Sequence, residues 1–200
     1  MTATTPGHEA PMPKAVRHLV IVLGDQLDAE SSAFDGFDAT QDVVWMAEVA
    51  EESTHVWSAK QRTAVFLSAM RHFAAELRER GLPVLYNALD DANNAGTLAA
   101  ALQQAIAALR PSGLVLTAPG DWRVLHSLRA VAAQHPLPLD LRDDTHFFST
   151  VREFAAYAQG RKQLRLEYWY RELRQKHGIL MEGRAPIGGQ WNFDADNRES

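Results

Sequence analysis

Acidic side chains and one histidine gather in the segment after the apolar run at residues 42–49. Glu48, Glu51, Glu52 and His55 lie within a short stretch of chain there. Carboxylates in such a group can act as general acids, bind a hard cation, or accept hydrogen bonds from a polyhydroxylated ligand. Acidic residues after a strand more often cap the next helix or face solvent. The hydrogen-bonding role is therefore favoured over catalysis and metal binding.

A second polar turn, Gly24-Asp25-Gln26-Leu27, follows the apolar run at 18–24. It lacks the G-x-G-x-x-G pattern of a dinucleotide site, and the Asp25 carboxylate would repel a pyrophosphate. Asp121, after a later apolar run, has the type and position of a helix N-cap.

Other catalytic signatures are missing from the sequence. No Walker loop, G-x-S-x-G elbow or H-E-x-x-H motif occurs, and the eight histidines show no metal-ligand spacing. The lack of cysteine excludes disulfides, thiolate-held zinc, an iron–sulfur cluster and a cysteine nucleophile within these 200 residues. No catalytic or metal-ligating residue is predicted.

Alternating strands and helices are predicted to position the two acidic turns. Because such an order implies right-handed crossovers, the fold class is α/β, with a doubly wound, Rossmann-like, five-stranded and mainly parallel sheet. Ligands of such sheets lie beyond the carboxyl ends of the strands, which is where both turns fall. The predicted strands are 18–24, 42–49, 83–89, 113–119 and 137–141, and the predicted helices are 58–81, 97–110 and 121–135.

The helix at 58–81 has apolar residues at a spacing of three to four. Val65, Ala69, Phe73 and Leu77 are predicted to form its buried stripe, and Gly81 is predicted to end it.

The alternation of predicted strands and helices ends near residue 145. A capping box at Thr150 and Glu153 predicts a helix to residue 159, and a second helix is predicted at 161–178. Arg, Lys, Tyr and Trp alternate in that second helix, which could contact phosphates and bases. Glu167 and Glu172 lie among them, so a surface buried against another domain is favoured. The expected organisation is a mobile leader at 1–16, an α/β domain at 17–145 and a helical extension and linker at 146–200.

Composition narrows the function classes further. A net charge of −5 argues against a chain wrapped in nucleic acid. The longest apolar run, 19–23, is far below the ~20 residues of a membrane span, and the N-terminus has no signal-peptide core. A cytoplasmic protein without membrane contact is expected.

A series of motifs carries a resemblance to a known family. In order, they are GDQL, MAEVAEES, FLSAMRHFAAELRERG, LDDANNAGTL, APGDWRV, GRKQLRLEYWYRELRQKHGILMEG and PIGGQWNFDADNR. Together they resemble the N-terminal region of the bacterial iron–sulfur cryptochromes and photolyases, the prokaryotic (6-4) photolyase class, from residue 17 to the end.

The resemblance implies a two-part protein. An N-terminal antenna-type domain can hold 6,7-dimethyl-8-ribityllumazine, and a helical C-terminal domain holds FAD, a [4Fe–4S] cluster and the lesion pocket. The resemblance places Gly24, Asp25, Gln26 and Glu52 beside the lumazine. His55 stands where relatives can have Tyr, and Phe66 where a smaller aliphatic residue can line the pocket.

Two functions stay open at this point. The first is an antenna-type module of a light-driven DNA repair enzyme or photoreceptor, which reaches damaged DNA only through the full-length protein and its C-terminal domain. The second is a self-standing, non-catalytic binding protein for a lumazine-, flavin- or nucleotide-like ligand.

Overall fold

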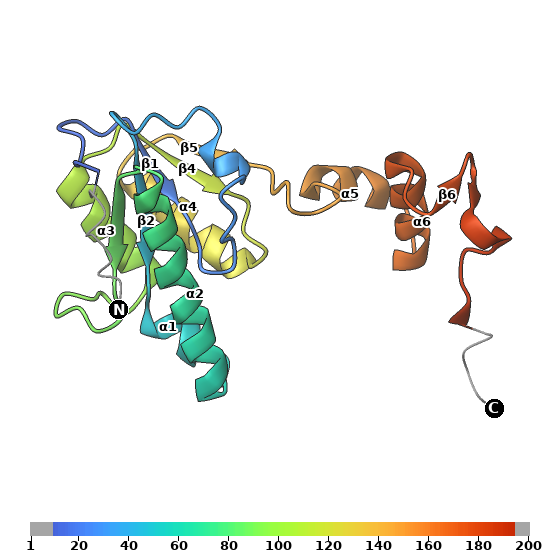
Figure 1. Ribbon diagram of the computed structural model, residues 1–200, viewed down its shortest axis with the longest axis horizontal. Helices are drawn as coiled ribbons and strands as arrows, with labels where there is room; N and C mark the ends of the chain where they lie inside the picture. Colours follow the sequence, from blue (N-terminus) through green and yellow to red (C-terminus); the bar gives the residue numbers. More distant parts are fainter. Residues whose placement is uncertain (1–9, 195–200) are drawn as a thin grey trace, which may run out of the picture. The chain divides into compact units, whose positions relative to one another are not determined.

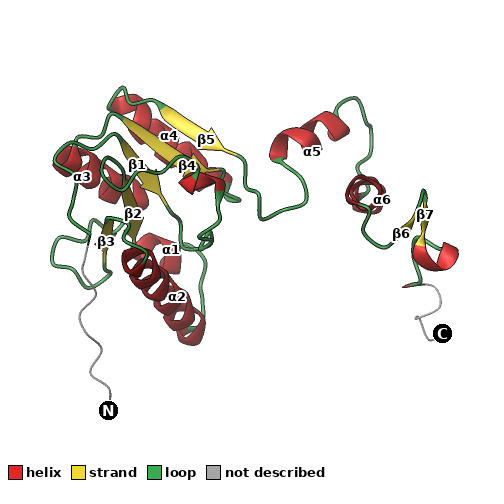
Figure 2. Ribbon diagram, turned by 45° about the horizontal axis from the view of Figure 1, so that its top comes forward, coloured by secondary structure: helices red, strands yellow, loops and turns green. Residues whose placement is uncertain are grey.

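Five parallel strands form the central sheet of the computed structural model. Their order is β3-β2-β1-β4-β5, and every pairing between them is parallel (Figures 1 and 2). The predicted α/β fold class is confirmed. The strands are shorter than the predicted apolar runs, with bounds β1 His18–Ile21, β2 Val43–Ala47, β3 Val84–Asn87, β4 Gly113–Thr117 and β5 Leu139–Arg142.

The structure describes residues 10–194, and the chain divides into two compact units, 1–144 and 145–200. Each unit is described by itself. Residues 1–9 of the predicted leader lie outside the described residues, whereas Val16 at its other end is buried in the core. No helix within residues 10–194 has the length and apolar character needed to cross a membrane.

Helices cover both faces of the sheet (Figure 2). One face packs against α3 (Leu98–Leu109) and α4 (Trp122–Gln134), and the other packs against α2 (Lys60–Glu79) and the 3-10 turn η1 (Ser32–Phe34). The short helix α1 (Ala50–Thr54) follows β2 directly. Because both faces are covered, β2 and β4 are buried along their whole length, as is usual for central parallel strands.

The buried stripe of α2 differs from the predicted one. Val65 and Ala69 are exposed, so half of the prediction is wrong. The helix carries a second apolar series, one residue further on, that contains larger side chains. Burying these larger side chains removes more apolar area from water, and the helix therefore rotates to place them inward. The inward side chains are Phe66, Met70, Phe73, Ala74 and Leu77.

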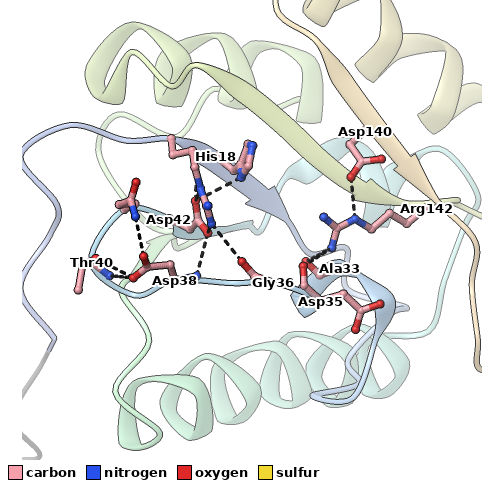
Figure 3. A network of polar contacts seen from close by, with 11 residues as sticks. His18, Ala33, Asp35, Gly36, Asp38, Thr40, Asp42, Asp140 and Arg142 are labelled. Carbon is pink, nitrogen blue, oxygen red and sulfur yellow. Dashed lines mark hydrogen bonds and ion pairs between the residues drawn. The ribbon is translucent and has the colours of Figure 1, made fainter.

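Buried charge fixes the long loop between β1 and β2 at the amino ends of these strands (Figure 3). Asp42 accepts hydrogen bonds from the Arg17 guanidinium at 2.9 Å and from the backbone amides of His18 and Asp38. Burial alone would raise the pKa of Asp42, but these bonds outweigh it and lower the pKa. Arg142 of β5 donates to the carbonyls of Ala33 and Asp35 in the same loop.

The second unit contains α5 (Val151–Ala158), α6 (Leu166–His177), a two-stranded hairpin of β6 (Met181–Glu182) and β7 (Ala185–Pro186), and the turn η2 (Ile187–Gly189). The capping box at Thr150 is confirmed.

The predicted start of the second helix at residue 161 is wrong. Gly160 has φ of 75°, in the left-handed region, and residues 161–165 are not helical. Arg161 turns back instead, donating to the Tyr157 carbonyl at 2.7 Å and lying 3.9 Å above the Tyr157 ring. These contacts favour a non-helical link between α5 and α6.

Candidate functional site

A cavity of about 120 Å³ lies at the carboxyl ends of β1, β2 and β4. This is the point where the strand order reverses, because β2 lies on one side of β1 and β4 on the other. Ligand crevices of doubly wound sheets form at such points. The lining comes from β2, from the turns after the three strands and from α1, α2, α3 and α4. We call this cavity the inner chamber.

Apolar side chains form most of the inner chamber. Trp45 of β2, Met70 of α2 and Leu98 of α3 line it together with Val124 of α4. The indole N–H of Trp45 donates to the Asn87 side chain at 3.0 Å, so its polar atom is satisfied outside the chamber. The chamber therefore presents a mainly apolar lining to a ligand.

Glu48 is a buried anchor of the chamber wall. Arg71 holds its carboxylate with two bonds, at 2.6 and 2.8 Å, and Tyr86 donates to it at 2.5 Å. The backbone amide of Leu89 adds a further bond at 2.7 Å. Burial would raise the pKa of Glu48, but these donors outweigh it and lower the pKa. The carboxylate is ionised, and both of its oxygens accept hydrogen bonds. Its role is therefore to hold β2, α2 and β3 together beside the chamber.

Glu52 is an acidic group whose pKa is raised, whereas the pKa of Glu48 is lowered. It is exposed at the rim, yet partial burial raises its pKa, and the neighbouring carboxylates of Glu51, Asp25 and Asp121 raise it further, whereas the Arg123 guanidinium lowers it. The Glu52 carboxyl group can form hydrogen bonds with hydroxyl groups of a ligand.

Asp121 is confirmed as the N-cap of α4, where its side chain accepts from the Arg123 amide at 2.7 Å. The hydrogen bonds from the Arg123 side chain and amide lower the pKa of Asp121. The residue also lines the inner chamber.

The Phe66 ring packs directly onto the backbone of Gly24. A Cβ atom built on Gly24 would lie 2.4 Å from Cζ of Phe66 and 2.8 Å from Sδ of Met70. Any larger residue at position 24 would therefore force Phe66 or Met70 to move.

A second cavity, of about 200 Å³, adjoins the inner chamber. We call it the outer chamber. Its lining is mostly polar and comes from the turn after β1, from α1, from the loop between α1 and α2, and from the first two turns of α2. The residues are Asp25, Glu52, Ser53, Ser58, Arg62, Thr63 and Phe66.

The structure brings four of the six predicted site residues together. Gly24, Asp25, Glu52 and Phe66 line the inner chamber. Gln26 lines neither chamber: its amide nitrogen donates to the Ala118 carbonyl at 3.1 Å and ties the turn after β1 to the end of β4. His55 is exposed at the end of α1 and also lines neither chamber. Ligand contact by all six stays a prediction.

Sequence reasoning did not find the partners of Glu48. Arg71 and Tyr86 lie on α2 and β3, far from Glu48 along the chain. One signal was available: both are long hydrogen-bonding side chains in elements predicted to flank the strand at 42–49. Within residues 10–194, no group of three or more His, Asp or Glu side chains is arranged to hold a metal ion.

Comparison with known proteins adds two findings. The sequence model of a family described as "Deoxyribodipyrimidine photo-lyase-related protein" matches residues 20–200. A protein of Agrobacterium fabrum (strain C58) named "(6-4) photolyase" is 46% identical over 181 residues. That alignment covers 90% of this chain and 36% of the relative, so the chain spans about a third of the relative's length.

Proposed function

The chain belongs to the deoxyribodipyrimidine photo-lyase-related protein family, and from this membership we propose that it is the antenna-type module of a light-dependent DNA repair photolyase or related photoreceptor. The observation that carries the proposal is the 46% identity, over 181 residues, with a protein named as a (6-4) photolyase. The proposed substrate of the whole protein is accordingly DNA carrying a (6-4) lesion.

We propose that the redox groups of such a protein bind outside these residues. The 200 residues contain no cysteine, so a cysteine-ligated [4Fe–4S] cluster would take its ligands from another part of a longer protein. The proposed site of FAD and of the damaged base is likewise a helical domain beyond this chain. The α/β unit would then contribute a ligand crevice, and the exposed apolar side chains of residues 145–194 would contribute an interface.

The lumazine that the resemblance implies does not fit the crevice as it stands. Sites for ligands of this size span about 300–1,000 Å³, whereas the inner chamber measures about 120 Å³. Phe66 occupies the space above Gly24 that a ring would need. The polar rim agrees better with the ligand, because Asp25 and Glu52 can accept hydrogen bonds from ribityl hydroxyls.

Repair of a damaged oligonucleotide tests the proposed function. The gene is read downstream for a continuation that encodes cysteines, and the full-length product is assayed under blue light for reversal of a (6-4) lesion by chromatography. We expect repair by the full-length protein, and neither repair nor bound flavin for the 200-residue chain alone. Purification of this chain with stoichiometric flavin would overturn the proposal that FAD binds in another domain.

The same purification addresses the second candidate function. A self-standing binding protein requires a gene that ends with this chain and a product that binds a lumazine, flavin or nucleotide without repair activity. A full-length protein that repairs DNA excludes that alternative.

A further inference from the structure

Three charged side chains are buried among the described residues, and one of them lacks a partner of opposite charge. Asp42 pairs with Arg17, and Glu48 pairs with Arg71. Arg174 of α6 is only 7% exposed, yet no described Asp or Glu forms an ion pair with it. A buried charge is costly unless an opposite charge and hydrogen bonds compensate it. Arg174 therefore needs an explanation that the other two charges do not.

The contacts that Arg174 makes come from uncharged groups. Its guanidinium donates hydrogen bonds to the backbone carbonyls of Ile179, at 3.3 Å, and of Leu180. Its Cζ atom lies 5.3 Å from the Trp191 ring centroid and 5.6 Å from the Tyr170 ring centroid. Carbonyls and rings stabilise a cation, but they do not neutralise it. A guanidinium has five N–H donors, so donors remain for a further acceptor.

A second donor without an acceptor lies beside Arg174. Arg171 precedes it by three residues on the same face of α6, and its Cζ atom lies 5.4 Å from the same Trp191 ring centroid. Nε of Arg171 is buried and has no hydrogen-bond partner among the described residues. Two cations and their unused donors are thus held next to one ring.

The carboxylates of the segment 161–178 are already paired. This segment contains six Arg or Lys side chains and two glutamates, in a chain whose net charge is −5. Glu167 pairs with Arg171, and Glu172 pairs with Arg161. The segment therefore has excess positive charge, which favours an acidic partner surface.

The apolar side chains around Arg174 indicate what kind of partner this is. Tyr170, Ile179 and Leu180 are 49, 39 and 56% exposed. A buried Arg among Tyr and Trp rings is typical of the energetic centre of a protein–protein interface. Interfaces with DNA are more polar, so this composition favours a protein partner. We call the following residues the arginine surface: Tyr170, Arg171, Arg174, Ile179, Leu180 and Trp191.

We propose that the arginine surface docks an Asp or Glu side chain of the helical domain, with Arg174 as its ion-pair partner. The inference rests on the proposed function, which assigns that domain to a longer protein. The alignment with the (6-4) photolyase covers 36% of that relative, so a protein of its length has ample chain to supply the carboxylate. Arginine suits this role because its planar guanidinium can bind a carboxylate through two parallel hydrogen bonds.

Zero-length cross-linking of the full-length protein identifies the partner. Arg174→Lys keeps the positive charge as an amine, and a carbodiimide joins an amine to a carboxylate in contact with it, with loss of water. Peptide mass spectrometry should find this amide between position 174 and an Asp or Glu beyond residue 200. Lys176 already pairs with Glu153, so their cross-link is the internal positive control.

Other patterns of cross-linking contradict the proposal. A cross-link from position 174 to a carboxylate of these 200 residues, in the same or a second copy, would place the partner inside this chain. Absence of a cross-link at position 174, in a sample that forms the control cross-link, would also overturn the assignment.

Hydrogen exchange measures the contribution of Arg174 to docking. In the full-length protein, Arg174→Gln should speed exchange in α6 and the hairpin by about thirtyfold or more, because it leaves the partner carboxylate buried and unpaired. Arg165→Gln, which removes an exposed cation at the start of the same helix, is the matched control and should change exchange by less than about fivefold.

The same two variants of the 200-residue chain separate docking from helix capping. Arg174→Gln should have a clearly smaller effect there, because only contacts with carbonyls and rings are lost. An equal increase in the full-length protein and in the 200-residue chain would assign Arg174 to the end of α6 alone, and would overturn the proposal.

DNA binding distinguishes a carboxylate from a phosphate. We expect Arg174→Gln and Arg165→Gln to have the same small effect on the affinity of the full-length protein for lesion-containing DNA, measured in the dark over a salt series. A loss confined to Arg174→Gln, with the salt slope reduced by about one, would assign Arg174 to a DNA phosphate and overturn the proposal. Repair is measured on the unmodified protein, so failure of the Arg174 assignment leaves the proposed function standing.

Discussion

The two units of this chain bury very different amounts of apolar surface. In the α/β unit, side chains of the central strands such as Leu19, Val43 and Trp45 are completely buried. Among the described residues of the second unit, Tyr157 is the only buried large apolar side chain. Exposed apolar side chains are numerous there and include Phe147, Phe148, Leu164, Leu166, Tyr168, Tyr170, Ile179, Leu180, Ile187 and Phe193.

Different forces therefore stabilise the two units. The α/β unit has the covered core of an independently folding domain. The second unit has only a small aromatic cluster among its described residues, in which the Tyr157 and Trp169 ring centroids lie 4.7 Å apart. It also has the capping box of α5 and cations beside rings: Arg171 and Arg174 lie 5.4 and 5.3 Å from the Trp191 ring centroid. Cation–π contacts contribute about 0.5–1 kcal/mol each at exposed sites and about 2 kcal/mol where the cation is buried, as Arg174 is. Under the proposed function, we expect the proposed helical domain to cover the remaining apolar surface, because large exposed patches normally mark an interface.

Hydrogen exchange should show the largest contrast between the units. Amides of the sheet from His18 to Leu141 should exchange only on global unfolding, whereas amides of residues 161–194 should exchange about a thousandfold faster through local opening. Mass spectrometry of peptides from the 200-residue chain measures both. Equal protection of the amides of the two regions in a monomeric sample would contradict the expected difference in their stability.

Truncation of one leucine in each unit gives the next largest effect. Leu102 on α3 is fully buried, and Leu102→Ala should lower the free energy of unfolding by about 2–5 kcal/mol in a urea titration. Leu166 on α6 is 73% exposed, and Leu166→Ala should change that free energy by less than about 0.5 kcal/mol. Similar losses for the two variants would mean that the second unit shares the core of the first.

The Glu48 anchor predicts a smaller, pH-dependent loss. Its pKa in the folded protein is lowered, so its contribution is present above the unfolded pKa and disappears as pH falls through the folded pKa. Glu48→Gln should destabilise the chain by about 1–3 kcal/mol at pH 7, and the difference should shrink toward pH 3.

Asp90→Asn is the matched control for that substitution. Asp90 also faces Arg71, at 3.5 Å, but its side chain is 83% exposed. We expect less than about 0.5 kcal/mol at either pH. A Glu48→Gln loss that is equal at pH 7 and pH 3 would contradict the ionic role of the anchor.

Local patterns explain the parts of the fold that the sequence predicts well. Runs of β-branched residues mark the strands, and Asp121, Thr150 and Gly81 mark helix ends through chemistry that acts within a few residues. The stripe of α2 was mispredicted because two apolar series overlap in that helix. Packing against the sheet decides between Val65 and Phe66, and a helical pattern read alone does not contain that information.

The site was predictable only in part. The turns after β1 and β2 were located from strand order, and Phe66 from the resemblance. The anchor at Glu48 depends on Arg71 and Tyr86, which lie 23 and 38 residues away along the chain. Such pairs follow from tertiary packing. The close packing of the Phe66 ring onto Gly24 likewise joins residues far apart in the chain.

The parallel pairing of β1 with β4 has a consequence for synthesis of the protein. His18 pairs with Gly113, roughly ninety-five residues later in the chain. At about 5–20 residues per second, one edge of β1 waits roughly 5–20 s for its partner to leave the ribosome. The hydrogen bonds from Arg142 to the carbonyls of Ala33 and Asp35 form later still, because Arg142 is synthesised after Gly113. The central strand is therefore the segment of this sheet that most needs chaperone protection while the chain is being made.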